Sequence, residues 1–183
     1  LAELVQEGKV RAIGLSNEHP WGVMQFIRLA DELGLPRVLS TQNAYNLITR
    51  TFETSLAEVC HCEKIGLLAY SPLAFGHLTG KYLNDPAAPG RLSQWPAFGQ
   101  RYCKPNVIPA VTAYAALAKK YELTLTQLAL GFVRSRWFVS STIIGASSLT
   151  QLQETLPATR TAISDELLDE INAIHLKYTN PAP

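Results

Sequence analysis

The residues best suited to chemistry in this chain follow a short apolar run that ends at Tyr70. This run, Leu67 to Ala69, passes directly into Tyr70 and Ser71 and then into a glycine-punctuated segment that contains Lys81. A short apolar run that stops abruptly at polar and turn residues is typical of a buried parallel strand. Glycines let a backbone lie close to a ligand, and an aromatic ring, a hydroxyl and a lysine would suit a flat, anionic cofactor. The ring of Tyr70 could equally belong to the core.

Strand patterns alternate with helical patterns along the whole chain. We predict strands at 9–17, 38–42, 66–70 and 141–144, and helices at about 20–33, 52–60, 107–121 and 125–133, from 148 and from 165, with a capping box at Thr124. This alternation predicts a parallel sheet covered by helices. Four strands are half of an eight-stranded barrel. We therefore predict an α/β fold of the (β/α)8 TIM-barrel type, C-terminal half only, as a single partial domain over 1–183.

Polar residues stand where the predicted strands end. Parallel sheets place their ligands at this edge, and the candidates there are Ser16, Asn17, Gln42, Tyr70, Ser71 and Ser147. The segment 84–106 shows no period and contains four prolines, and a loop this long in a compact domain is usually functional or disordered.

The composition excludes several classes of protein. The chain has 183 residues, of which 47% are apolar and 17% charged, and its net charge is +1. It has neither the basic footprint of a nucleic-acid-binding domain nor an apolar run long enough to cross a membrane. Three cysteines favour a reducing, cytoplasmic setting. The first residues begin without methionine and read as the last two turns of a helix closed by Gly8, so we expect a fragment of a longer protein.

Simpler explanations exist for several of these residues. Ser16 and Asn17 could bind a ligand amide or could cap the helix that begins near Pro20, and the two readings are equally open. Gln42 is more simply an isolated glutamine at a strand end. Gln151 could complete a capping box that begins at Ser148, instead of facing an anion at the exposed N–H groups of 145–147.

Other motifs fail on spacing. The stretch 76–82 has three residues between its glycines, where a phosphate-binding loop has four, and Tyr82 follows its lysine instead of Ser or Thr. Cys60, His61 and Cys62 look metal-like, but residues two apart on a helix point in different directions, so no metal site is predicted. Composition and spacing give no complete catalytic constellation.

Four ordered motifs resemble the aldo-keto reductase family over essentially the whole chain. Residues 8–17 resemble its fifth barrel strand, 42–46 the sixth, 68–73 the seventh and 143–147 the eighth. The ending 178–183 resembles a branch that contains bacterial Tas-type proteins and potassium-channel β-subunits. The resemblance implies a barrel that binds NADPH in extended form and reduces aldehydes or ketones.

The resemblance also assigns cofactor contacts. It implies that the nicotinamide end meets Ser16, Asn17, Gln42 and Tyr70. It implies that the pyrophosphate is lined by Ser71, Pro72, Leu73 and Ala74, with Lys81 and Arg91 on the long loop that folds over the cofactor. It implies that the adenosine 2′-phosphate and adenine meet Gly145, Ala146, Ser147, Gln151 and Glu154. Thr155 replaces an asparagine usual in the family, which weakens one adenine contact.

No catalytic residue is assigned in this chain. The Asp, Tyr, Lys and His tetrad of the family lies on the first four strands, which the chain lacks, so Tyr70 is not the proton donor. We expect the NADPH-binding half of a reductase, inactive alone and active with its N-terminal half on a small carbonyl substrate. The alternatives are a truncated product that acts as a self-associating or interaction module and a regulatory NADPH-sensing subunit.

Overall fold

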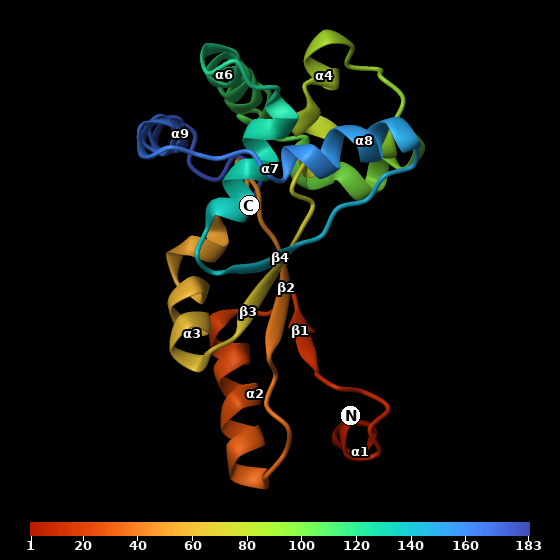
Figure 1. Ribbon diagram of the computed structural model, residues 1–183, viewed down its shortest axis with the longest axis vertical. Helices are drawn as coiled ribbons and strands as arrows, with labels where there is room; N and C mark the ends of the chain where they lie inside the picture. Colours follow the sequence, from red (N-terminus) through yellow and green to blue (C-terminus); the bar gives the residue numbers. More distant parts are fainter.

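Four strands form one parallel sheet in chain order. The computed structural model describes the backbone of residues 1–183 and all side chains except those of Pro96 and Phe98. The strands are β1 (Gly14–Ser16), β2 (Ser40–Ala44), β3 (Gly66–Tyr70) and β4 (Val139–Thr142), each parallel to the next. Figure 1 shows their arrangement. The predicted α/β class is confirmed, and four parallel strands with surrounding helices are consistent with a partial (β/α)8 barrel.

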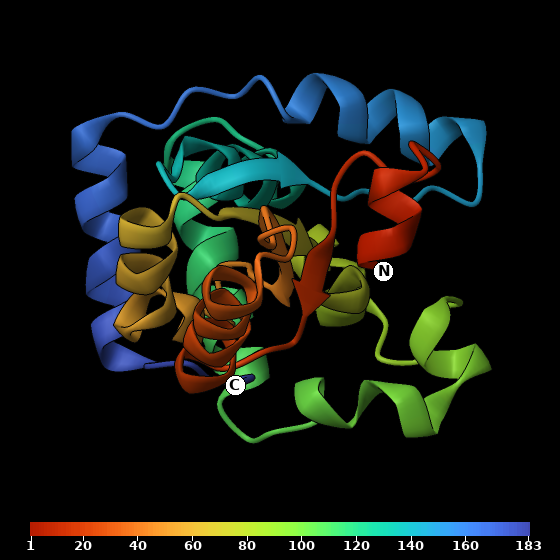
Figure 2. The same cartoon turned by 90° about the horizontal axis from the view of Figure 1, so that it is seen from below.

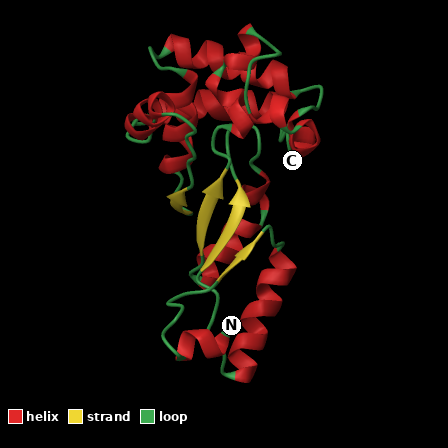
Figure 3. Cartoon of the chain, turned by 90° about the vertical axis from the view of Figure 1, so that its right-hand side faces the viewer, coloured by secondary structure: helices red, strands yellow, loops and turns green.

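Helices make every connection between the strands. The first part of the chain contains α1 (Ala2–Gln6), α2 (Pro20–Leu33), η1 (Thr51–Thr54) and α3 (Leu56–Glu63). The long crossover from β3 to β4 contains η2 (Ala74–Thr79), α4 (Lys81–Asn84), α5 (Arg91–Gln94), η3 (Pro96–Tyr102), α6 (Val107–Lys120) and α7 (Leu125–Ser135). After β4 come α8 (Leu149–Ala158) and α9 (Asp165–Lys177). Figure 3 shows a layer of helices beyond the carboxyl ends of the strands.

Helix α7 occupies the middle of the core. It begins at the predicted capping box, where the Thr124 hydroxyl accepts from Gln127 N at 3.1 Å and Thr124 N donates to the Gln127 side chain at 2.8 Å. Phe132 on this helix is fully buried and stacks on Tyr45 at 5.8 Å between ring centroids. Phe138 meets the same Tyr45 ring edge-on at 5.2 Å. These rings join the end of β2 to the helices above it.

β3 has its predicted bounds, whereas the other three strands differ from theirs. β1 has three residues, because β2 begins opposite Gly14 and offers no partner to residues 9–12. β2 and β4 are each displaced by two residues, and the β3–β4 register shifts at Leu67/Leu68. The segment 84–106, predicted without regular structure, contains the short helices α5 and η3. These helices are too short for a helical period of apolar residues to be recognised in the sequence.

The last residues of the chain dock against the loop that follows β2. Ala182 is fully buried, and its N–H donates to Ile48 O at 3.0 Å while its carbonyl accepts from the Thr49 hydroxyl at 2.6 Å. The side chain of Asn180 accepts from Arg50 N at 2.6 Å. The tail therefore belongs to the fold.

Arg50, only 5% exposed, is held by an acidic partner at this junction. Its guanidinium donates to both carboxylate oxygens of Glu53 at 2.8 Å and to the Asn172 side chain at 3.0 Å. Tyr45 donates to the same carboxylate. Burial raises the pKa of Glu53, but the hydrogen bonds from Arg50 and Tyr45 outweigh burial and leave that pKa below its usual value.

Within the part of the chain that the structure describes, none of the helices combines the length and apolar character that a bilayer crossing requires. The cytoplasmic setting stays a prediction.

We expect the substitution Glu53→Gln to lower the free energy of unfolding by about 3 kcal/mol, because it leaves the buried Arg50 without its counter-charge. The depressed pKa of Glu53 adds stability above the pKa of the unfolded chain, and this stability is lost as pH falls through the lower, folded value. Urea unfolding of the chain at pH 7 and at acid pH measures both effects.

The matched control is Glu58→Gln on α3, where the side chain is exposed, and its effect should stay within about 0.5 kcal/mol. Equal effects of the two substitutions would show that the Arg50–Glu53 pair does not stabilise the junction.

Candidate functional site

The carboxyl ends of β1, β2 and β3 bring the first predicted group together. Ser16 pairs directly with Gln42, and Ala44 pairs with Tyr70. Past the end of β1, Asn17 N donates to Gln42 O at 2.9 Å. The Tyr70 hydroxyl donates to Asn17 Oδ1 at 2.8 Å, which ties β3 to β1 across the end of β2. Residues far apart in sequence thus share one edge of the sheet.

The capping explanation for Ser16 and Asn17 is wrong. Helix α2 has His19 as its N-cap residue, with no side-chain capping bond. The Asn17 side chain, which accepts from Tyr70, also donates to the Ser16 hydroxyl at 3.3 Å. Both residues are exposed, so their remaining donors and acceptors face away from the core.

The turn after β3 has a strained backbone. Ser71, Ala74 and Phe75 have φ angles of 53°, 48° and 56°, and Asn17 on the neighbouring strand end has 55°. Left-handed conformations cost energy for residues other than glycine, and such residues gather at binding and catalytic sites. The strain therefore marks the same edge of the sheet as the polar side chains do.

Only part of the predicted lining after β3 can meet a ligand through side chains. Pro72 and Ala74 are buried, and Leu73 packs against the core. The Ser71 carbonyl accepts from the Asn46 side chain at 2.9 Å, which fixes the turn from below. Contacts to a ligand are left to the Ser71 side chain and to backbone groups.

A cavity of about 320 Å³ lies against Tyr70. Its other lining residues are Phe75, Arg101 and Tyr102, none of which the sequence assigned to the site. Burial raises the pKa of Tyr102, and the nearby Arg101 only partly opposes this, so the phenol stays neutral. No signal in the sequence singled out Arg101 and Tyr102, since η3 is too short to show a helical period, and Phe75 lies on the equally short η2.

Lys81 and Arg91 lie at opposite ends of a chain of ring contacts. The Lys81 ammonium stands 4.8 Å from the centroid of the Tyr82 ring, and the Arg91 guanidinium stands 5.1 Å from that of Phe75. Between them, consecutive ring contacts of 5.2, 5.7 and 5.0 Å link Phe75, Tyr102, His77 and Tyr82. These contacts fix both cations relative to the turn after β3.

Two glycines make room for the Lys81 side chain. A Cβ atom on Gly90 would come within 2.3 Å of Lys81 Nζ, and one on Gly76 within 2.9 Å of its Cε. The ammonium donates to Pro89 O at 3.0 Å. Lys81 therefore crosses a narrow passage between two backbone segments.

The second predicted group lies beyond the end of β4. Ile143 N donates to Ala69 O at 2.8 Å, so this segment leaves the sheet beside β3. Its exposed residues are Gly145, Ala146, Ser147, Gln151 and Glu154. Figure 2 shows α8 and the 84–102 segment at separate places around the end of the sheet. Among the described residues, no hydrogen bond or ring contact links this group to Tyr70, Lys81 or Arg91.

The capping box predicted at Ser148 is half formed. The Ser148 hydroxyl accepts from Gln151 N at 3.3 Å, as predicted. The Gln151 side chain, however, accepts from the N–H and the hydroxyl of Ser147, at 2.9 and 3.1 Å. Thr155 is buried and donates to Gln151 O at 2.8 Å, so it faces its own helix.

The two cysteines next to His61 lie on different sides of α3, one facing the core and the other facing solvent. Cys60 is buried, which raises its pKa to about 11, whereas Cys62 is exposed. Among the described residues, no group of three or more histidine, cysteine or acidic side chains is placed to hold a metal ion.

Comparisons with known proteins agree with the four strand-end motifs. The sequence profile described as "Aldo/keto reductase family" matches residues 1–175. Protein tas of Escherichia coli K12 is 44% identical over 183 residues, which is 100% of this chain and 53% of that protein. The NADH-specific methylglyoxal reductase of the same bacterium is 30% identical over 165 residues, covering 90% of this chain and 48% of the relative.

A further relative is the probable voltage-gated potassium channel subunit beta of Arabidopsis thaliana, 35% identical over 134 residues, or 70% of this chain and 40% of that protein. The chain spans about half the length of the curated relatives it matches. Because the family profile covers nearly all of its residues, the chain belongs to the aldo/keto reductase family.

Proposed function

We propose that this chain binds NADPH at the carboxyl edge of its sheet and forms the cofactor-binding half of a carbonyl reductase. The observation that carries the proposal is the convergence of Ser16, Asn17, Gln42 and Tyr70 on one edge, locked by the hydrogen bond from Tyr70 to Asn17. When bound, such a cofactor supplies a hydride to the carbon of an aldehyde or ketone.

The Tyr70 ring is suited to carry a nicotinamide. Its hydroxyl is tied to Asn17, so the ring keeps one orientation, and it lines the cavity of about 320 Å³. Ser16 and Gln42 stand next to each other on the same side of this edge. Hydroxyl and amide side chains offer both donors and acceptors, which is what a carboxamide needs for orientation.

Lys81 and Arg91 are suited to the negative charges of a pyrophosphate. An ammonium has three N–H donors, and the bond to Pro89 O occupies one of them. The Arg91 side chain is exposed and rests on Phe75, beside the strained turn. Lys81 lies just before the 84–106 segment and Arg91 lies within it, so the proposal makes 84–106, together with the turn that precedes it, the cover of the cofactor.

The start of α8 is suited to the 2′-phosphate that distinguishes NADPH from NADH. The Gln151 side chain accepts from both the N–H and the hydroxyl of Ser147, so an anion there would replace Gln151 as the acceptor of these two donors. One relative is named for its specificity for NADH, so the preference for NADPH rests on this segment and needs its own test.

Proton transfer to the carbonyl oxygen needs an acid that the proposal does not assign to any residue of this chain. The residues that bind the carbonyl substrate and the acid that protonates it would belong to the remainder of a longer protein. Trp21, Phe26, Leu29 and Leu33 are exposed along α2, which favours the pairing with an N-terminal half that the sequence predicted.

We expect Tyr70→Ala to weaken NADPH binding about tenfold, because the ring face is lost. Tyr70→Phe keeps the ring and removes only the bond to Asn17, so its affinity should stay within about threefold. Titration of the chain with NADPH, followed by cofactor fluorescence, measures both. Absence of binding to the unaltered chain, or equal affinity of Tyr70→Ala, would refute the assigned platform.

We expect Ser147→Asp to weaken NADPH binding about tenfold while NADH binding changes little, because the new carboxylate would repel only the 2′-phosphate. Gln153→Glu, which adds the same charge farther along α8 at another exposed position, is the matched control. The same fluorescence titration compares the cofactors. An equal loss for NADPH and NADH would place the 2′-phosphate elsewhere.

We expect the 183-residue chain to bind NADPH without oxidising it in the presence of 4-nitrobenzaldehyde, because none of its assigned residues is the proton donor. The loss of NADPH absorbance over time measures turnover, with Tyr70→Ala as the variant deficient in binding. Turnover by the unaltered chain that disappears in this variant would overturn the view that the chain lacks its acid.

A further inference from the structure

A second cavity, of about 450 Å³, lies between the start of the 84–106 segment and helix α6. Its walls are mainly apolar and consist of His77, Tyr82, Leu83, Pro86, Leu92, Ile108 and Thr112. None of these residues belongs to the proposed cofactor contacts. A volume of this size suits a small molecule.

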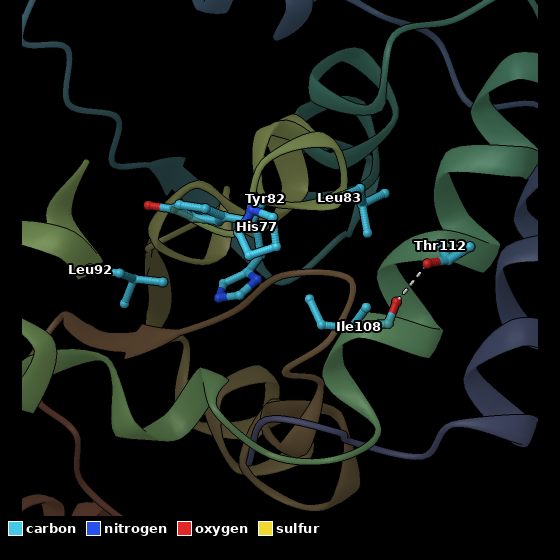
Figure 4. Close-up of a pocket in the computed structure, with 7 residues that line it drawn as sticks. His77, Tyr82, Leu83, Leu92, Ile108 and Thr112 are labelled. Carbon is cyan, nitrogen blue, oxygen red and sulfur yellow. Dashed lines mark hydrogen bonds between the residues drawn. The ribbon is translucent and has the colours of Figure 1, made fainter. Parts of the chain in front are cut away.

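The cavity contains a buried imidazole with no hydrogen-bond partner. His77 is 6% exposed, and neither of its ring nitrogens has a partner among the described residues. Figure 4 shows this ring between Tyr82 and Ile108, with Leu92 across the cavity from it. Buried polar groups in native proteins are nearly always paired, so an imidazole in this position calls for an external partner.

Few other polar atoms line the cavity. The Tyr82 hydroxyl is also buried without a partner among the described residues. The Thr112 hydroxyl donates to Ile108 O at 2.9 Å, so only its acceptor capacity remains. A ligand would therefore find one imidazole and one phenol at the end of an apolar space.

The charges around the cavity favour an uncharged ligand. Burial, with a smaller effect of Lys81, lowers the pKa of His77, so the ring is neutral at pH 7 and has one donor and one acceptor. Lys81 itself is turned to Pro89 O and the Tyr82 ring, and no charged residue is among the described residues that line the walls. An ionised ligand would lose its hydration without gaining a counter-charge.

We propose that this cavity is a second binding site, for a small, uncharged, mainly apolar molecule with one hydroxyl group, of the size and chemistry of a phenol, which hydrogen-bonds His77. The site does not rest on the proposed cofactor function. It adjoins the cavity at Tyr70 through the ring contact between His77 and Tyr102.

The test compares three probes on the 183-residue chain: p-cresol, toluene and 4-methylbenzoate. NMR of the imidazole signals follows binding, because the chain has only four histidines. We expect p-cresol to shift the His77 signals with a dissociation constant of roughly a millimolar, the scale for a fragment of this size. Toluene should bind about tenfold more weakly, since it lacks the hydrogen bond. 4-Methylbenzoate should leave these signals unchanged.

Two variants separate the imidazole from the space around it. In His77→Phe the reporting imidazole is gone, so binding is followed through the NMR signals of the probes themselves, and p-cresol and toluene should bind equally. The same change at the exposed His61 should preserve the tenfold preference. Ile108→Trp, at a half-exposed position of the wall, fills the cavity and should abolish binding of both probes while His77 stays in place. Circular dichroism reports whether each variant folds.

Several results would overturn the proposal. These are His77 signals that no probe moves, equal affinities of p-cresol and toluene for the unaltered chain, or p-cresol binding that survives in Ile108→Trp. If His77→Phe does not fold, the ratio of the two affinities in the unaltered chain and the result with Ile108→Trp decide the question.

Discussion

Parallel pairing of the strands in chain order is the constraint on which the site depends. A parallel ladder requires the chain to return to the same end of the sheet before each new strand, so every connection is a crossover. The carboxyl ends of all four strands then meet at one edge. Ser16 and Gln42 become neighbours for this reason alone, and Tyr70 comes within hydrogen-bond distance of Asn17.

Beyond the sheet, contacts between aromatic rings position the two cations of the candidate site, Lys81 and Arg91. The segment that carries Lys81 and Arg91 has no strand to pair with, and its helices are too short to be stable alone. Packing among Phe75, Tyr102, His77 and Tyr82 supplies the missing order, and each end of this ring series carries one cation. The same packing offsets the cost of the left-handed residues at 74 and 75.

Local signals in the sequence were enough for the architecture. Apolar runs with polar ends located the four strands, and the capping box at Thr124 located the start of α7. Strand bounds were less accurate, because where a strand begins depends on its neighbour: β1 is short since nothing pairs with residues 9–12. The docking of the tail at Ala182 was missed for the same reason, as its hydrogen bonds go to residues more than a hundred positions away.

The candidate site was also only partly predictable from local sequence, because Ser and Asn serve equally as helix caps and as ligand contacts. The position of His19 at the start of α2 removes the capping role of Ser16 and Asn17, and their contact with a ligand stays a proposal.

Two buried polar side chains, Arg50 and His77, differ in whether the chain itself supplies their hydrogen-bond partners. Arg50 donates to Glu53 and Asn172 through two of its three guanidinium nitrogens and has the Glu53 carboxylate as its counter-charge, although its Nη1 has no partner among the described residues. His77 is buried to the same degree, but its neighbours are rings and aliphatic groups, and its desolvation is compensated by nothing in the described chain. The first arrangement stabilises the fold whether or not a ligand is present. The second leaves an interaction unmade, and a molecule that completes it gains the binding energy that folding did not use.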